Sequence, residues 1–371
     1  METGISANRE NYIDNIRSIT VLIVIVYHVV YLFNSAGVVK SIGPVGIQAF
    51  DSLCYFVYPW LMAIMFLLAG ISAKYALQHR TGKQFLKERV QKLLAPLVGG
   101  IFLLAWINGW VSSQYVDMFG NDYVPPFIKY LIFCLFIGPL WFNLELFFVS
   151  LILLLVRKID KRERFSQFIG RSNIFILCLL ALPFWGASFL LNAPLITTFR
   201  NGIYLFVFLT GYYIFSNKKI IQVLIKYRYA LLIAGILLGI VETYYFYGQN
   251  YAADACLQHP LTNLYAWIMM LAFLGFSKKH FDFTNAFLQY TKNRSFYWYL
   301  CHYPIMAFTA YYITTFFKLP MIYNYIVVLI VSSVGTLLFS EIICKVPVLR
   351  YWLFGIKKKS AIFKSQSHLY L

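Results

Sequence analysis

Long runs of apolar residues fill most of the chain and alternate with short polar segments. A membrane-spanning helix needs roughly 20 predominantly apolar residues, and about ten runs reach or approach that length. A weaker stretch, 126–138, begins at a pair of prolines and predicts an interfacial or re-entrant piece. We therefore expect an all-α, polytopic membrane protein with about ten transmembrane helices, at 16–33, 53–75, 93–112, 141–156, 174–191, 201–216, 229–247, 261–277, 296–317 and 322–344.

The composition supports a membrane class. Hydrophobic residues make up 60% of the chain and charged residues 12%, whereas soluble proteins carry about 25% charged residues. The sequence has no glycine-rich linker and no clear internal repeat. It therefore predicts one membrane-embedded domain, 1–356, followed by a basic cytoplasmic tail, 357–371.

The net charge of +18 is distributed unevenly. Alternate loops together with the two ends hold 28 of the 32 Lys and Arg residues, and the opposite loops hold the other 4. Basic residues concentrate on the cytoplasmic side of membrane proteins, so both termini are expected in the cytoplasm. The basic loops predict contact with anionic lipid and an anionic cytoplasmic ligand, and not with nucleic acid.

Cysteine spacing gives no sign of a metal site. The six cysteines are scattered, and no CxxC or Cys/His spacing typical of metal ligands occurs. Free, buried thiols are the expected state, and we expect neither a metal nor a bound cofactor.

Two ionisable residues share one face of the first predicted span. From Arg17 to His28 are eleven steps, which at about 100° each make three turns plus about 20°. The same steps rise about 16 Å, half of a bilayer core. Arg17 would lie at the cytoplasmic mouth of a cavity that His28 lines, although snorkelling of Arg17 and a core role for His28 are the alternatives.

Five segments carry the polar and aromatic residues that stand out in these runs. They are "YIDNIRSITVLIVIVYH" with Asp14, Arg17 and His28; "ERVQKLLAP" with Arg89 and Lys92; "PLWFNLELF" with Trp141; "NRSFYWYLCHYPIM" with Ser295, Tyr299, His302 and Pro304; and "EIICKVPVLRYWLFG" with Glu341 and Pro347. In this order they resemble the membrane-bound acyltransferase-3 family. Lys92 departs from the arginine usual there, which keeps the charge but loses bidentate phosphate binding.

The resemblance implies transfer of an acyl group, acetyl or succinyl, from cytoplasmic acyl-coenzyme A to a hydroxyl of an extracytoplasmic glycan or glycolipid. It implies an O-acyltransferase in the inner membrane of a bacterium, with acyl-coenzyme A as co-substrate. The phosphates of coenzyme A need cations at the cytoplasmic mouth. The expected donor-binding residues are Arg17, Lys87, Arg89, Lys92, Ser295 and Tyr299.

A sugar hydroxyl needs a base, and neutral imidazole is suited to that role. We expect His28 to act as the base or to carry the acyl group covalently. Glu145 could orient His28 or bind an acceptor hydroxyl, or it could simply pack against Asn143. His302 could orient Glu341, line the donor tunnel, or cap a kink at Pro304.

Three residues are assigned to acceptor binding or structural support: Asp14, Trp141 and Glu341. Trp141 could stack on a sugar or belong to the interfacial aromatic belt. Glu341 could instead pair with Lys345, four residues on. Glu242, in the outer part of the seventh span, is expected to be solvated at the interface.

A transporter or flippase for a polysaccharide or lipid-linked sugar is the main alternative, and ten spans would suit it. The sequence shows no inverted repeat and no paired broken helices in corresponding halves. A membrane scaffold is a third class, but it gives no reason for Arg17 and His28 to share a face.

Overall fold

The computed structural model describes residues 10–40, 42–120, 123–160, 172–190 and 200–357, and within these ranges every regular element is a helix. The predicted tail, 357–371, lies outside them except for its first residue. The first half contains α1 (Asn11–Leu32), α2 (Gln48–Gln78), α3 (Gly82–Arg89), η1 (Val90–Leu94), α4 (Ala95–Gly100), η2 (Ile101–Ala105), α5 (Trp106–Ser113), α6 (Pro126–Cys134), η3 (Gly138–Leu140), α7 (Trp141–Ile159), α9 (Ile174–Leu179) and α10 (Ala181–Ala187). The second half contains α11 (Asn201–Thr210), η4 (Gly211–Phe215), α12 (Lys218–Lys226), α13 (Arg228–Tyr245), α14 (Asp254–Leu257), α15 (Pro260–His280), α16 (Ala286–Tyr312), η5 (Ile313–Phe317), α17 (Met321–Lys345) and α18 (Pro347–Phe354).

Among the described residues, seven helical segments are long and apolar enough to cross a membrane. They are Asn11–Leu32, Gln48–Gln78, Gly82–Ser113, Gly138–Ile159, Arg228–Tyr245, Pro260–His280 and Met321–Lys345. The other three predicted spans also coincide with helices. Two are the shorter apolar helices Ile174–Ala187 and Asn201–Phe215, and the third is α16. The all-α, multi-pass architecture is confirmed, while the number of crossings stays a prediction.

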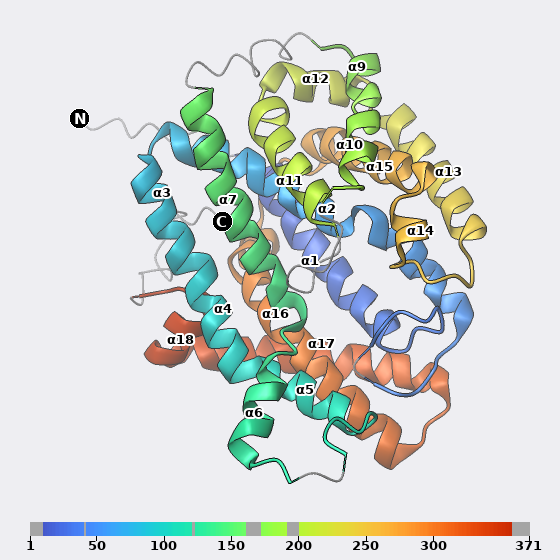
Figure 1. The fold of residues 1–371 in the computed structure, drawn as a ribbon. Coiled ribbons are helices and arrows are strands. Elements are labelled where there is room, and N and C mark those ends of the chain that lie inside the picture. Colours follow the sequence, from blue (N-terminus) through green and yellow to red (C-terminus); the bar gives the residue numbers. More distant parts are fainter. Residues whose placement is uncertain (1–9, 41, 121–122, 161–171, 191–199, 358–371) are drawn as a thin grey trace.

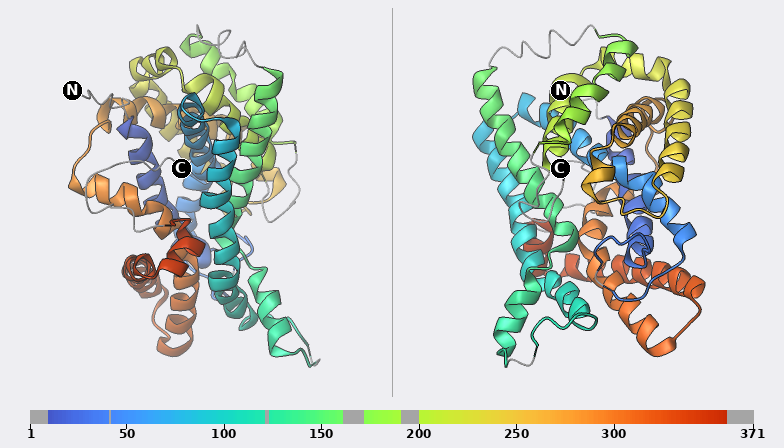
Figure 2. Two further views of the ribbon diagram at one scale, coloured as in Figure 1. Left: turned by 90° about the vertical axis from the view of Figure 1, so that its left-hand side faces the viewer. Right: turned by 45° about the vertical axis from the view of Figure 1, so that its right-hand side comes forward.

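The helices surround a central pair, α1 and α2 (Figure 1). Helices α13 and α15 pack together on one side, whereas α7 runs beside the segment from α3 to α5 on the other (Figures 1 and 2). Helix α16 packs along α1, and α17 packs on α16. The weak stretch at 126–138 forms the short helix α6, which packs against α5. The first span is therefore enclosed by protein on several sides.

Two local features hold the elements around the first span. The side chain of Asn285 caps α16 by accepting the backbone N–H of Leu288 at 2.8 Å, which fixes where that helix begins. Helix α2 crosses α11 and η4 at Gly70 and Gly211, where an added Cβ would collide with the backbone of the facing helix. Small residues allow such close approach of membrane helices.

One polar residue of the outer helices is not where the sequence suggests. Glu242 is 3% exposed and accepts a hydrogen bond from the Thr262 hydroxyl at 2.7 Å. The expectation of a solvated carboxylate was wrong because α15 packs along α13 and covers that face.

Candidate active site

A pair of histidines from α1 and α16 lies at the centre of the bundle. The Nε2 atom of His302 lies 3.1 Å from Nδ1 of His28. His302 is fully buried, and its Nδ1 lies 2.7 Å from the carbonyl oxygen of Tyr299 and 3.1 Å from that of Trp298. Nδ1 of His28 also lies 2.9 Å from the carbonyl oxygen of Val24. His28 therefore faces the protein interior, and the two rings form one hydrogen-bonded unit.

These contacts define the protonation of the neutral pair. Carbonyl oxygens only accept hydrogen bonds, so Nδ1 of His302 carries the proton and its Nε2 presents a lone pair. That lone pair faces Nδ1 of His28, which must then be the N–H. Nε2 of His28 is left with the lone pair, and it has no hydrogen-bond partner within the described part of the chain. The geometry thus makes Nε2 of His28 the basic atom of the pair.

Tyrosine rings surround His28 on its remaining sides. The ring centroids of Tyr27, Tyr31 and Tyr303 lie 5.0, 5.8 and 5.1 Å from that of the imidazole. All three contacts are edge-to-face, with interplanar angles of 70° to 89°. This packing restricts rotation of the imidazole and keeps bulk water away from it.

A cavity leads from Arg17 towards the pair. It holds about 440 Å³ and is lined by Arg17, Val21, Met65, Ala69, Leu93, Phe142, Leu146, Ser295, Phe296 and Tyr299. Arg17 and Ser295 supply polar groups to an otherwise largely apolar wall. The lining ends at Tyr299, one helical turn before His302, so packed side chains separate the cavity from His28 itself. An apolar wall with few polar groups is typical of a ligand site.

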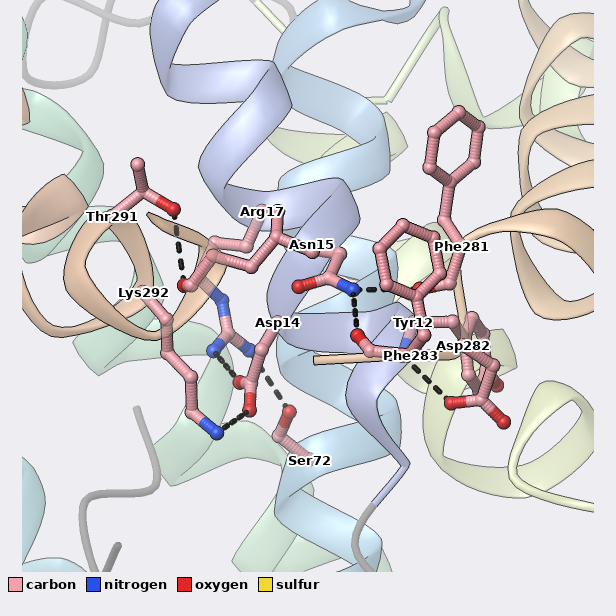
Figure 3. Close-up of polar contacts among 11 residues, drawn as sticks. Tyr12, Asp14, Asn15, Arg17, Ser72, Phe281, Asp282, Phe283, Thr291 and Lys292 are labelled. Carbon is pink, nitrogen blue, oxygen red and sulfur yellow. Dashed lines mark hydrogen bonds and ion pairs between the residues drawn. The ribbon is translucent and has the colours of Figure 1, made fainter. Parts of the chain in front are cut away.

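Charged side chains gather at the Arg17 end of this cavity (Figure 3). The guanidinium of Arg17 donates to Asp14 at 3.2 Å and to the Ser72 hydroxyl at 3.0 Å. Lys292 of α16 lies 3.0 Å from the other oxygen of Asp14. Asp14 thus joins two cations from two helices, Arg17 of α1 and Lys292 of α16, at the Arg17 end of the cavity.

The segment before α16 is attached to the first turn of α1. The Asn15 amide donates to the carbonyl oxygens of Phe281 at 2.6 Å and Phe283 at 2.8 Å (Figure 3). The backbone N–H of Tyr12 donates to Asp282 at 3.0 Å. These contacts fix the position of α16 relative to α1, and they therefore help to bring His302 to His28.

A second, smaller pocket lies between the end of α2 and the beginning of the next helical segment. It holds about 230 Å³ and is lined by Ala76, Arg80, Phe85, Glu88, Arg89 and Lys92. Arg89 is buried, and its guanidinium carbon lies 4.6 Å from the Phe85 ring centroid. Arg80 forms an ion pair of 2.8 Å with Glu88. The predicted donor residues Arg89 and Lys92 are thus brought together.

Other predicted site residues lie apart from these groups. Lys87 is exposed on α3 and lines neither pocket. The ring of Trp141 stacks on Tyr204 at 5.4 Å and 25°, inside the protein. Glu145 makes no hydrogen bond or ion pair within the described ranges, and the structure gives no contact between it and His28. The proposed orientation of His28 comes from His302 instead.

Glu341 holds α17 to α16. Its two oxygens accept bonds from Nε and Nη2 of Arg294 at 2.6 and 3.2 Å, a bidentate geometry. The Tyr290 hydroxyl adds a bond of 3.3 Å. The alternative pair with Lys345 was wrong because Arg294, on the neighbouring helix, reaches the carboxylate from the side. His302 does not orient Glu341, since its ring contacts His28.

Sequence reasoning missed three polar contributors to the site: Ser72, Arg80 and Lys292. Ser72 and Arg80 had no motif to mark them. Lys292 stands one residue before a quoted motif, and its i, i+3 relation to Ser295 would have placed it near the cavity-lining face of α16.

Comparisons with known proteins agree with this arrangement. Residues 10–344 match the model of a family described as "Acyltransferase domain". The protein named Glucans biosynthesis protein C of Salmonella typhimurium is 23% identical over 385 residues, covering 96% of this chain and 98% of that protein. Its namesake of Salmonella paratyphi B is 22% identical over 377 residues, covering 95% and 96%. No solved structure matches.

The matched region contains α1 with Arg17 and His28, both pockets, and α16 with His302. It ends within the last residues of α17. The chain belongs to the acyltransferase-3 family and is a membrane-embedded O-acyltransferase.

Proposed function

We propose that this protein transfers an acyl group from acyl-coenzyme A to a hydroxyl of a glycan or glycolipid, in the inner membrane of a bacterium. The donor enters at the Arg17 end, which the excess of Lys and Arg in alternate loops assigns to the cytoplasm. The bacterial relatives, whose name refers to glucan biosynthesis, support a glycan acceptor. We place this acceptor on the opposite side of the membrane from the donor.

The hydrogen-bonded pair of His28 and His302, one turn beyond a cavity that begins at Arg17, carries this proposal. The donor has an anionic nucleotide, a flexible pantetheine arm and a terminal thioester. Arg17 lies at one end of the cavity, and the imidazole of His28, with an available lone pair on Nε2, lies beyond the other end. The narrow apolar wall suits the arm, and Ser295 offers a hydroxyl to its amides.

The transfer step needs one proton relay. Nε2 of His28 takes the proton of the acceptor hydroxyl as its oxygen forms a bond to the thioester carbonyl carbon. The C–S bond then breaks, and the imidazolium returns the proton to the departing thiolate of coenzyme A. His302 holds the imidazole through Nδ1 and stabilises its charged form. A covalent acyl group on Nε2 of His28 is the second route, and it would require the same tautomer.

Membranes incubated with acetyl- or succinyl-coenzyme A labelled in the acyl group test the proposal. We expect labelled glycan with the wild type, and a rate about 10²–10⁴-fold lower for His28→Ala, because a positioned base contributes that factor. His79→Ala is the matched control, since His79 is an exposed histidine whose side chain lines neither pocket.

The same experiment can fail in a defined way. Unlabelled glycan from wild-type membranes, with protein present and folded, would contradict acyl-coenzyme A as the donor or a glycan as the acceptor. A His28→Ala rate equal to that of His79→Ala would contradict the assignment of the base. Label retained on the protein after brief acid-free denaturation would favour the covalent route.

A further inference from the structure

The smaller basic pocket suggests how the donor is recognised, an inference that rests on the proposed function. Arg80 comes from the C-terminal end of α2, whereas Arg89 and Lys92 come from the helical segment that follows. Arg80 lies two residues beyond the last residue of α2 and belongs to none of the segments that resemble the family. Only the fold, and no sequence motif, places Arg80 in the lining of this pocket.

The elements that carry the cations set their positions. Arg17 of α1 donates to the Ser72 hydroxyl of α2 at 3.0 Å. Arg80 follows Ser72 along the same segment and stands just beyond the last residue of α2. Arg17 lines the larger cavity, and the other cations line the smaller pocket. The ring of Tyr27, the residue before His28, stacks on Tyr58 of α2. Helix α2 therefore runs from the level of His28 to the level of Arg17, and Arg80 lies beyond that level, away from the histidines.

The size of the pocket limits what it can hold. Its empty space, about 230 Å³ with the part open to solvent included, is about half that of the larger cavity, about 440 Å³. A small pocket lined by three cations suits one phosphate group rather than a complete nucleotide. Coenzyme A has a diphosphate close to its pantetheine arm and a separate phosphate on the ribose, farther from the thioester. The order of the cations matches Arg17, in the larger cavity, to the diphosphate, and the smaller pocket with Arg80 to the ribose phosphate.

Glu88 gives the pocket a competing anion. Its carboxylate lies 2.8 Å from Nη1 of Arg80, and the same guanidinium would have to turn towards an incoming phosphate. A phosphate dianion offers more charge and more acceptor oxygens than a carboxylate. Glu88 therefore holds Arg80 at the pocket between turnovers, and an incoming phosphate has to displace this carboxylate from Arg80.

We propose that Arg80, with Lys92, binds the 3′-phosphate on the ribose of acyl-coenzyme A, and that Glu88 competes with this phosphate for Arg80. Arg80 is then a specificity-determining residue for nucleotide donors. Lys87, two residues from Arg89 and exposed, has no part in this contact.

Initial rates with acetyl-coenzyme A and acetyl-3′-dephospho-coenzyme A test the proposal in the full-length protein in membranes. For the wild type we expect a KM about tenfold or more lower for the phosphorylated donor, since a hydrogen bond to a charged group is typically worth that factor. Arg80→Gln should remove most of this preference by raising the KM for acetyl-coenzyme A alone. Glu88→Gln should lower the KM for acetyl-coenzyme A, because the phosphate no longer competes with a carboxylate for Arg80, and should change the KM for the dephospho donor little.

Controls separate the possible outcomes. Lys83→Gln removes an exposed cation from the same helix as Arg89 and should leave both KM values unchanged. Arg80→Lys keeps the charge and should retain part of the preference for the phosphorylated donor. It provides the test if Arg80→Gln folds poorly. If Arg80→Gln kept the preference for the phosphorylated donor while the wild type transferred normally, the phosphate contact would be overturned and the proposed function would stand. A wild type that uses neither donor would instead overturn the proposed function.

Discussion

Replacing His302 by leucine tests whether this residue acts through His28. In the wild type, Nδ1–H of His28 has two acceptors, Nε2 of His302 at 3.1 Å and the Val24 carbonyl oxygen at 2.9 Å. The variant removes only the first, so the proton of His28 still has an acceptor and the same tautomer. A single hydrogen bond contributes about 0.5–1.5 kcal/mol net, which corresponds to about 2–13-fold in rate. We expect His302→Leu to lower kcat by that factor, far less than His28→Ala.

The assay is the transfer of labelled acyl group at saturating and at low donor concentration, so that kcat and KM are obtained separately. His302→Gln is the matched variant, because its amide oxygen can accept from His28 while its NH₂ group donates to the Tyr299 carbonyl. It should retain more activity than His302→Leu with the same KM for the donor. A loss in His302→Leu as large as that in His28→Ala would refute the reasoning and make His302 the base. A rate equal to the wild type would refute the orienting contact.

The remaining predictions concern stability. Gly70→Ala should destabilise the protein by about 1–3 kcal/mol, because its Cβ would overlap the backbone of α11. Gly186→Ala is the control, since a Cβ there meets nothing within 4 Å. Equal thermal unfolding of the two variants in detergent would contradict the close crossing of α2 and α11. Arg294→Gln and Glu341→Gln should each lower stability, with a coupling of about 0.2–1 kcal/mol in a double-mutant cycle because the pair is partly exposed. A coupling of zero would mean that the bidentate contact does not form.

The positions of the helices could be predicted because each depends on local sequence. Apolar runs locate all the predicted spans on helices. The period of the α-helix predicts one face of α1 for Arg17 and His28, and both lie beside α16: Arg17 lines a cavity with Ser295, and His28 contacts His302. The cavity itself stops short of His28, contrary to the expectation that His28 lines it. Neither inference requires knowledge of the neighbouring helices.

Partners across helices could not be predicted in this way. The contacts of His28 with His302 and of Glu341 with Arg294 depend on how α16 docks, and sequence spacing says nothing about docking. The same limit explains why the sequence does not show which of Lys87 and Arg89 faces the smaller pocket. They differ by two residues, or about 200° around a helix, so only one can face the pocket, and the motif alone does not say which. Glu242 was misplaced because its cover comes from α15.

The separation of the two histidines along the chain affects biosynthesis. His28 enters the membrane 274 residues before its partner is made, which at about 5–20 residues per second takes roughly 14–55 s. During that interval an imidazole and a guanidinium in the first helix lack the groups of α16 that later cover them. Intermediate chains would expose polar surface to lipid, so insertion factors have a window in which to hold the first helix. Variants that weaken docking of α16 should prolong this exposed state beyond synthesis, and should therefore be present in membranes in lower amounts than the wild type.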